Sequence, residues 1–305
     1  DLLYMNNQPS SNLEGIIAAR MTGIKSLLHS RIETELNFFE VKAVNKWLTK
    51  MICVSEGVRE SFLRQGIEPL KCSTVYNGIE AGIIPAIPPD EIRQELGLKG
   101  NELLIGSAGS LVKRKRFADL IKAMATFSSQ NPEVRIQDKK NPPLPPFDKG
   151  GVGGFFNKIK CVILGDGSER ELLQKEIEKN KLNDYVMLAG FKSEAISYIN
   201  AMDIFILPSE REGFPRVVLE AMLMGKPVIA SRIAGPLELI EEGRTGFLYN
   251  TGDVNTLSSH IAKLVSEPPL RKSLGEAGRK RVIENFSIEK YVSTVENNFA
   301  EVLKL

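Results

Sequence analysis

Short apolar runs alternate with longer segments of helical periodicity along almost the whole chain. Strands are predicted for the apolar runs 26–29, 51–54, 73–76, 103–108, 161–164, 185–188, 204–207, 227–230 and 246–249. Between them, apolar positions recur at helical spacing over 116–127, 169–180, 215–224 and 254–266. Strands that alternate with helices indicate a mainly parallel sheet covered on both faces. We therefore expect an α/β protein built from doubly wound units.

Three prolines mark the break between two domains. Pro85, Pro88 and Pro89 form a stiff connector, and Pro89 followed by Asp90 and Glu91 is typical of a helix start. The expected organisation is an N-terminal domain over 1–84, a connector over 85–98, a larger α/β domain over 99–285 and a C-terminal helix over 286–305. The chain opens on Asp-Leu-Leu-Tyr-Met, which resembles the middle of an element. We therefore expect the N-terminal domain to be incomplete.

One segment interrupts the alternation. Residues 138–158 (DKKNPPLPPFDKGGVGGFFNK) are rich in Pro and Gly and have no periodicity. Without them, 131–136 would run directly into the strand at 161–164. We interpret the segment as a surface insertion in a helix–strand connection, without regular structure. A Pro-rich docking ligand is the alternative.

Composition narrows the class of protein. The formal net charge of +2 is too small for nucleic acid as a general partner. Cys53, Cys72 and Cys161 lack metal-binding spacing and suit buried reduced thiols, and His29 and His260 are too few for a histidine-rich metal site. No apolar run reaches the roughly 18 residues of a spanning helix, and no signal peptide is visible. These features are typical of a cytoplasmic enzyme.

The strongest candidate site is the loop 208–215 (PSEREGFP), which follows a predicted strand. Ligands of open α/β sheets bind beyond the carboxyl ends of strands. Pro215 suits the first turn of a helix, and Gly213 leaves room for a ligand near backbone N–H groups that can face an anion. Glu212 in the loop and Glu220 in the second helical turn can then line one cleft. Ordinary surface charges are the alternative.

The stretch EGFPRVVLEAMLMGKPVIAS resembles the signature of retaining glycosyltransferases of the GT-B fold, family 4 (glycosyl transferases group 1). That signature has two glutamates separated by seven residues, here Glu212 and Glu220. Further agreement, in the expected order, comes from VSEGVRESFLRQGI, VYNGIE, IGSAGSLVKRKRFADLIKA, VILGDGSERELLQ, VMLAGF and GRTGFLYNTGD. The resemblance covers nearly the whole chain except the insertion. It implies two Rossmann-like domains, an acceptor-side one over 1–84 and a nucleotide-sugar-binding one over 99–285. It also implies a nucleotide diphosphate sugar as donor substrate, with no cofactor.

The resemblance also assigns roles to the two glutamates. It implies that Glu220 hydrogen-bonds the ribose hydroxyls of the donor. Glu212 and the backbone of Gly213 and Phe214 would hold the donor sugar. Together with Lys115, Glu212 is the expected catalytic residue.

Phosphate binding in the family uses a Gly-Arg-Leu…Lys-Gly stretch, and this chain departs from it. Gly109 and Lys115 match, but Ser110 replaces the arginine. A hydroxyl brings no charge, so Arg114 or Arg116 would compensate, or phosphate binding would be weaker. A solvated basic turn is the alternative for this run. A nucleic-acid patch would need a broader basic stripe.

Two more glycine loops are expected at the cleft. Gly165 and Gly167 follow the strand at 161–164, and Gly190 and Phe191 follow the strand at 185–188. The resemblance puts the second loop beside the nucleotide base. Structural turns are the alternative for both.

The N-terminal part offers two further candidates for contact with the acceptor or the diphosphate. Arg31 occupies a position where the family often has a histidine near the donor sugar. His29 lies two residues earlier and would point to the same side of an extended strand, although a satisfied core histidine is the preferred interpretation. Asn77 is interpreted as structural.

No protein nucleophile is expected in a retaining enzyme of this kind. The departing diphosphate would accept the proton of the acceptor, and Lys115 and the helix N-terminus near Pro215 would stabilise it. No Asp-x-Asp motif is apparent, so transfer without a metal is expected. Two alternatives stay open, a nucleotide-sugar epimerase and a nucleotide-sugar-binding module without transferase activity.

The partners are expected by class only. The donor would be a UDP, GDP or ADP sugar, and the acceptor a glycan or a lipid-linked glycan of the cell envelope. A lipid-linked acceptor would bring peripheral contact with the inner face of the cytoplasmic membrane. The sequence does not name the sugar, the base, the acceptor or the oligomeric state.

Overall fold

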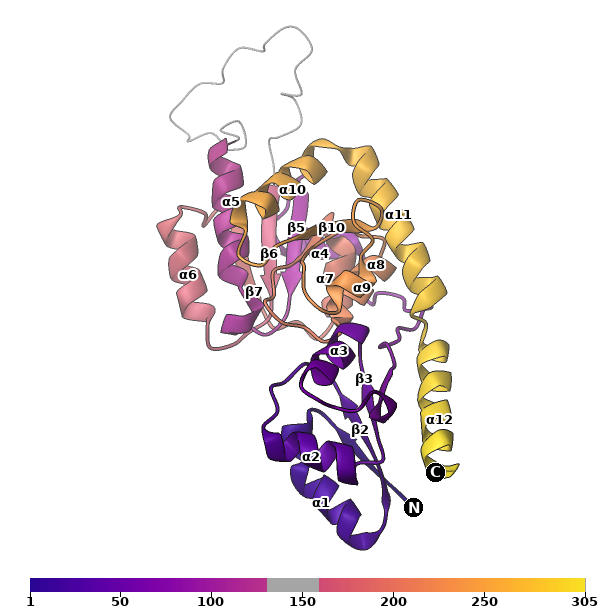
Figure 1. Ribbon diagram of the computed structural model, residues 1–305. Coiled ribbons are helices and arrows are strands. Elements are labelled where there is room, and N and C mark those ends of the chain that lie inside the picture. The colour runs from indigo at the N-terminus through magenta and orange to yellow at the C-terminus, as the bar shows by residue number, and fades with distance from the viewer. Residues whose placement is uncertain (131–158, 305) are drawn as a thin grey trace, which may run out of the picture.

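The computed structural model describes residues 1–130 and 159–304, which form two parallel sheets (Figure 1). The predicted insertion over 138–158 lies outside the described residues. The smaller sheet has the order β1-β2-β3-β4 and the larger one the order β10-β9-β8-β5-β6-β7, and their strands pair in parallel. These orders with covering helices confirm the expected α/β fold.

The strands have short bounds close to those predicted. They are β1 (Leu2–Asn6), β2 (Lys25–Ser30), β3 (Lys50–Cys53), β4 (Cys72–Thr74), β5 (Leu103–Ala108), β6 (Ile159–Leu164), β7 (Val186–Gly190), β8 (Ile204–Leu207), β9 (Val228–Ser231) and β10 (Gly246–Tyr249). Strand β1 was not predicted. It forms the edge of the smaller sheet and most of its side chains are partly exposed, so its apolar signal is weak.

Helices follow most of the strands. The α-helices are α1 (Leu13–Thr22), α2 (Phe38–Trp47), α3 (Glu56–Arg64), α4 (Pro89–Glu95), α5 (Phe117–Gln130), α6 (Arg170–Lys179), α7 (Ala195–Ala201), α8 (Arg216–Leu223), α9 (Pro236–Leu239), α10 (Val254–Ser266), α11 (Pro268–Asn285) and α12 (Ile288–Lys304). The 3-10 helices are η1 (Pro9–Asn12), η2 (Pro69–Lys71) and η3 (Lys113–Lys115). Side chains at several N-termini explain where helices begin. Asn37 and Glu40 form a capping box at α2, and Asp253 caps α10.

The connector predicted over 85–98 includes helix α4, which packs on α7 beside the larger sheet. Pro89 is its first residue, as the sequence indicates. Arg93 of α4 donates to the carbonyl of Ala201 over 2.8 Å and forms an ion pair with Asp203 at 3.2 Å. These contacts fasten the second half of the connector to the C-terminal domain.

The chain crosses between the domains a second time near its C-terminus. Helix α12 lies along the smaller sheet (Figure 1), and Val302 is fully buried there with Leu27, Ile52 and Val75. A parallel bridge between Ile79 and Ser287 joins the two crossings. The last helix of the chain therefore packs on the N-terminal domain.

The two sheets present their carboxyl ends to each other. A Cβ atom on Gly213, in the loop after β8, would lie 2.0 Å from the carbonyl oxygen of Arg31, which follows β2. The same Cβ would lie 2.8 Å from Cγ2 of Val54, which follows β3. A cleft bordered by the loops of both sheets is therefore the place to look for a ligand site.

Candidate functional site

Three glycine loops lie side by side at the carboxyl ends of β5, β6 and β7. The N–H of Gly109 donates to the carbonyl of Leu164 over 3.0 Å, and the N–H of Gly165 donates to that of Gly190 over 2.8 Å. A Cβ on Gly165, at a φ of 132°, would lie 1.9 Å from the Gly109 carbonyl oxygen. Only glycine permits this approach of two backbones. The structure thus brings three of the predicted donor loops together.

The neighbouring turn is equally close-packed. A Cβ on Gly167 would lie 2.5 Å from the carbonyl oxygen of Leu111, whose own N–H donates to Asp166 over 2.9 Å. At the end of β7, Phe191 is 77% exposed. A large exposed aromatic ring beside a glycine loop offers a flat apolar surface for a ligand.

Glu212 and Lys115, the two residues expected to be catalytic, contact each other across the loops after β8 and β5. The Lys115 Nζ and Glu212 Oε1 atoms are 2.5 Å apart, and the Ser209 hydroxyl donates to the same oxygen over 2.7 Å. Both charged side chains are only 10–12% exposed. Arg114 lies 4.0 Å from the second carboxylate oxygen. Two basic residues therefore surround one nearly buried carboxylate.

Arg114 and Arg116, the two arginines near Ser110, differ in how many acidic partners already bind them, and so in how available each is to a phosphate. Arg116 has a φ of 51° and binds Asp119 over 2.7 Å and Glu210 over 3.7 Å. Its hydrogen bond with Asp119 raises the pKa of its guanidinium, against the effect of burial. Among the residues that the structure describes, the Arg114 side chain makes only a 3.4 Å hydrogen bond to the Arg211 carbonyl and the long contact with Glu212. Of the two predicted substitutes for the missing arginine, Arg114 is the freer.

Glu220 lies in the second turn of α8 with 15% of its side chain exposed. Burial raises the pKa of its carboxyl group, and the charge of Arg216, whose Nε lies 3.0 Å away, opposes that shift. The Arg216 side chain is 72% exposed and holds the carboxylate only at the surface. Glu220 is thus a largely dehydrated carboxylate that hydroxyl donors from a ligand can reach by displacing an arginine.

The structure corrects two expectations for the loop before α8, one about Gly213 and one about Pro215. The space beside Gly213 is taken by the Arg31 carbonyl and not left open. Pro215 is the N-cap of α8, one residue before the predicted first turn. The Phe214 ring packs against Tyr76 at 5.0 Å and Phe286 at 5.3 Å between ring centroids.

The backbone of this loop still suits an anion. Within the described residues, the N–H groups of Gly213 and Phe214 have no hydrogen-bond partner. They lie immediately before α8, where the helix dipole favours negative charge. The loop therefore offers backbone donors close to Lys115 and Glu212.

Arg31 reaches this loop through Asn77. Its guanidinium donates to Asn6 over 2.9 Å and to the Asn77 side-chain oxygen over 3.0 Å. The Asn77 amide then donates to the Phe214 carbonyl over 3.0 Å. Asn77 thus ties the N-terminal domain to the loop 208–215, called the donor loop from here on. The sequence did not indicate this contact.

His29 is fully buried and does not line the cleft, which corrects its inclusion as a ligand contact. One ring nitrogen shares a 2.9 Å hydrogen bond with the Tyr4 hydroxyl, and the ring stacks on Tyr291 at 6.3 Å. Within the described part of the chain, its Nε2 atom has no partner. Burial, followed by the charge of Arg31, lowers its pKa to about 3. It is a neutral core histidine, but only half of its hydrogen-bonding capacity is used.

Within the residues that the structure describes, neither a metal cluster nor a membrane-spanning helix is found. No cluster of three or more His, Cys, Asp or Glu side chains is arranged there to hold a metal ion. Over the same ranges, no helix combines the length and the apolar character needed to cross a membrane.

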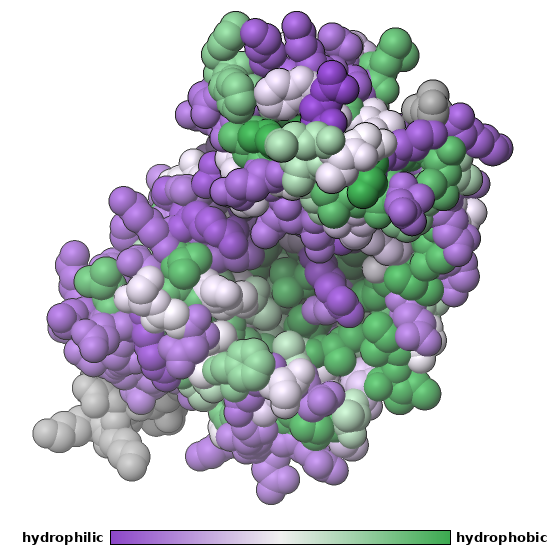
Figure 2. All heavy atoms as spheres, turned by 90° about the horizontal axis from the view of Figure 1, so that it is seen from below, coloured by the Kyte–Doolittle hydropathy of each residue, from purple (hydrophilic) through white to green (hydrophobic). Residues whose placement is uncertain are grey.

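Hydropathy differs over the surface of the molecule. Figure 2 views it from the end where the N-terminal domain lies in Figure 1. Hydrophilic residues cover much of this face, and hydrophobic residues gather in and beside a hollow near its middle.

Residues 154–281 match the family model Glycosyl transferases group 1. The match includes the two glutamates and the loops after β6 to β10.

Among similar curated proteins is N-acetyl-alpha-D-glucosaminyl L-malate synthase of Bacillus anthracis, 27% identical over 76% of this chain and 54% of the relative. Capsular polysaccharide biosynthesis glycosyltransferase CapM of Staphylococcus aureus is 26% identical over 97% of this chain and 76% of the relative. UDP-Gal:alpha-D-GlcNAc-diphosphoundecaprenol alpha-1,3-galactosyltransferase of Escherichia coli is 25% identical over 99% of this chain and 76% of the relative. The chain thus spans about half of the first relative and about three quarters of the other two.

A solved structure, Anabaena HepE in complex with UDP and glucose, superposes with a TM-score of 0.82. It is 21% identical over 99% of this chain and 78% of the other. This likeness confirms the predicted GT-B fold. The family match and the relatives confirm the predicted enzyme class, glycosyltransferase.

Proposed function

We propose that this chain holds the donor site of a retaining, family 4 glycosyltransferase that uses a nucleotide diphosphate sugar. The observation that carries the proposal is the Glu212–Lys115 pair beside the N-terminus of α8, with Glu220 one turn further on. Carboxylates that can accept from hydroxyl groups and cations that can bind phosphates thus lie together at the carboxyl ends of the strands of one parallel sheet.

The diphosphate would lie between Lys115, Arg114 and the free N–H groups of Gly213 and Phe214. The ion pair with Glu212 holds the Lys115 side chain at this position before the donor arrives. When the diphosphate binds, Lys115 can turn to it while Ser209 continues to hold the Glu212 carboxylate. These preorganised charges would stabilise the leaving group as the bond to the sugar breaks.

The remaining donor groups match the other residues of the edge. Ribose hydroxyls would donate to Glu220, and donor-sugar hydroxyls to Glu212. The base would lie by Gly190 and the exposed ring of Phe191. Charge-assisted hydrogen bonds of this kind are stronger than neutral ones.

Transfer would retain the anomeric configuration without a protein nucleophile and without a metal. The acceptor hydroxyl would attack on the face from which the diphosphate leaves, and a diphosphate oxygen would take its proton. Arg31, held over the donor loop by Asn77, would face the diphosphate or an acidic acceptor.

The acceptor would be a glycan or lipid-linked glycan of the cell envelope. The relatives in capsule and lipid-diphosphate glycan synthesis support this class. Exposed hydrophobic side chains of the N-terminal domain, among them Met21, Phe38 and Leu70, also suit a lipid-linked acceptor at the inner face of the cytoplasmic membrane. The relatives are named as transferases or synthases, which favours transfer over the epimerase and binding-module alternatives.

A donor screen tests the proposal. The protein is incubated with UDP-, GDP- and ADP-sugars, and the released sugar is followed by proton NMR from the first minutes. We expect hydrolysis of one donor class to give first the anomer of the donor. Release of the opposite anomer would contradict retention, and epimerised donor or no turnover of any donor would contradict transferase function.

A further inference from the structure

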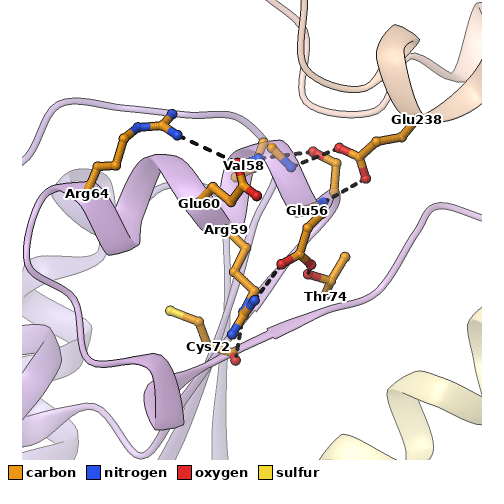
Figure 3. Close-up of polar contacts among 10 residues, drawn as sticks. Glu56, Val58, Arg59, Glu60, Arg64, Cys72, Thr74 and Glu238 are labelled. Atoms are coloured by element: carbon orange, nitrogen blue, oxygen red, sulfur yellow. Dashed lines mark hydrogen bonds and ion pairs between the residues drawn. The ribbon is translucent and has the colours of Figure 1, made fainter.

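A carboxylate of the C-terminal domain caps a helix of the N-terminal domain. Glu238, in the short helix α9, accepts the N–H of Glu56 over 2.8 Å and the N–H of Gly57 over 2.8 Å (Figure 3). These are the first two residues of α3. The third N–H, that of Val58, is taken by the Ser55 hydroxyl over 3.2 Å. The N-terminus of α3 is therefore satisfied from both domains.

The side chain of Glu56 itself does not compete for this position. Figure 3 shows it turned away from α9, and its carboxylate accepts from Arg59 over 2.5 Å and from the Thr74 hydroxyl over 2.5 Å. These partners, the Thr74 hydrogen bond first, lower the pKa of Glu56. Glu238 is thus the carboxylate that meets the positive end of the α3 dipole.

The backbone segments around this contact also pack closely against each other. A Cβ on Gly57 would lie 2.8 Å from Cβ of Ala234, just before α9. A Cβ on Gly235, at a φ of 79°, would lie 2.5 Å from the carbonyl oxygen of Gly213 in the donor loop. The segment that carries Glu238 therefore touches α3 on one side and the donor loop on the other.

Helix α9 is held at its other end by α11. Arg281 donates to the carbonyls of Glu238 and Leu239, each over 2.8 Å, and binds the Glu241 carboxylate. Both ends of this short helix are therefore fastened, which fixes the position of Glu238.

We propose that Glu238 is the interdomain positioning residue of this enzyme, which holds the N-terminal domain closed over the donor loop by capping α3. This inference rests on the proposed function for its catalytic consequence, but the closed arrangement itself can be measured without any ligand. Acceptor entry and product release require the cap to open. Catalysis requires it to close, because Arg31 reaches the donor loop only across the closed interface.

The first test measures domain closure in the full chain. Fluorescent dyes are attached to Met21→Cys on α1 and Leu172→Cys on α6, two exposed positions in different domains, while the three native cysteines are buried. Single-molecule energy transfer then gives the populations of closed and open forms. Glu238→Gln keeps the size but loses the charge and one acceptor, and should lower the closed-to-open ratio about tenfold or more.

Glu60→Gln is the matched control. Glu60 lies on the same helix in an exposed 3.6 Å pair with Arg64, on the side away from Glu238 (Figure 3). Glu60→Gln should leave the closed-to-open ratio unchanged. An unchanged ratio in Glu238→Gln, or an equal shift in both variants, would overturn the proposal.

The second test separates closure from donor binding. With the donor found active, Glu238→Gln should lower kcat about tenfold. The Kd of the free nucleotide should stay within about twofold, since its proposed contacts, apart from Arg31, lie on loops of the C-terminal domain. A weaker nucleotide Kd with unchanged kcat would overturn the assignment. If the wild-type chain turns over no donor, the proposed function fails, while the energy-transfer result still decides whether Glu238 closes the domains.

Discussion

Lys115 and Glu212 form an ion pair, and each side chain neutralises the charge of the other. Each is almost buried, so removing one leaves the other charge without its partner in a site of reduced polarity. The sequence indicated both residues from their motifs. Their direct contact depends on two strands, β5 and β8, that are neighbours in the sheet although about a hundred residues apart in the chain.

Substitution of Lys115 by Met should therefore lower kcat by about two to three orders of magnitude, the usual effect of removing one donor from a charge-stabilising site. Steady-state turnover of the active donor measures this. Lys113→Met, on an exposed neighbour in the same basic turn, should lower turnover less than about threefold. Equal losses in the two variants would mean that only the general charge of the turn matters.

His29 gives the N-terminal domain a predictable pH dependence. Its pKa is about 3 in the folded chain, against about 6.5 in an unfolded chain, so the unfolded state binds more protons between these values. This contribution to stability is complete above pH 6.5 and is lost as the pH falls towards 3. Its steepest slope is about 1.4 kcal/mol per pH unit.

The variant His29→Gln retains a hydrogen-bonding group for Tyr4 but does not titrate. Urea unfolding of both proteins at pH 7, 6 and 5 compares their slopes. The wild-type chain should lose stability on acidification faster than the variant. Parallel curves would show that folding does not lower the pKa of His29.

At the scale of elements, apolar patterning was sufficient for most strands and for α5, α6, α8 and α10. It did not predict α11, the longest helix of the described residues. The bounds of β5, β8, β10 and α10 agree with those predicted. The edge strand β1 and the role of α9 were missed, because a half-exposed strand and a single-turn helix carry little periodicity. Contacts between distant elements, such as Glu238 with α3, depend on topology and leave no local pattern.

The glycine loops permit a test at this scale. In Gly165→Ala, the new methyl group would collide with the Gly109 backbone, so the loops after β5 and β6 must separate. We expect at least a tenfold weaker donor Kd and a stability loss of about 1–3 kcal/mol. Calorimetry and thermal unfolding give the two quantities.

Gly97→Ala is the control for backbone strain alone. Gly97 has a φ of 70° with nothing within 4 Å of its Cβ position, and it lies outside the site. Gly97→Ala should lower the free energy of unfolding by about 1 kcal/mol and leave donor binding unchanged. If Gly165→Ala binds donor as well as Gly97→Ala does, the close approach of the loops has no part in binding.

At the scale of the whole molecule, the C-terminal helix makes the two domains interdependent. Helix α12 leaves the C-terminal domain and covers the smaller sheet, so that domain stability is shared across the chain. The sequence predicted a C-terminal helix but gave no indication of which domain it covers, because its apolar face fits any exposed sheet.

Val302→Asp should unfold or loosen the N-terminal domain, because it places a charge in the apolar contact with Leu27 and Ile52. Amide exchange in β2 and β3 should accelerate while β5 and β8 stay protected. Leu303→Asp, on the 53% exposed neighbour, should leave exchange unchanged. Uniform acceleration in both domains would mean that they unfold as one unit.

Titration calorimetry can show whether the edge around Glu212 and Glu220 binds a nucleotide diphosphate. Wild-type protein and Glu220→Gln are titrated with UDP, GDP and ADP at pH 7.5, with the exposed Glu171→Gln as control. We predict that one nucleotide binds the wild type and the control equally, and binds Glu220→Gln about tenfold or more weakly, since a ribose hydroxyl loses its charged acceptor. Equal affinity in all three proteins, or no binding of any nucleotide, would contradict the account.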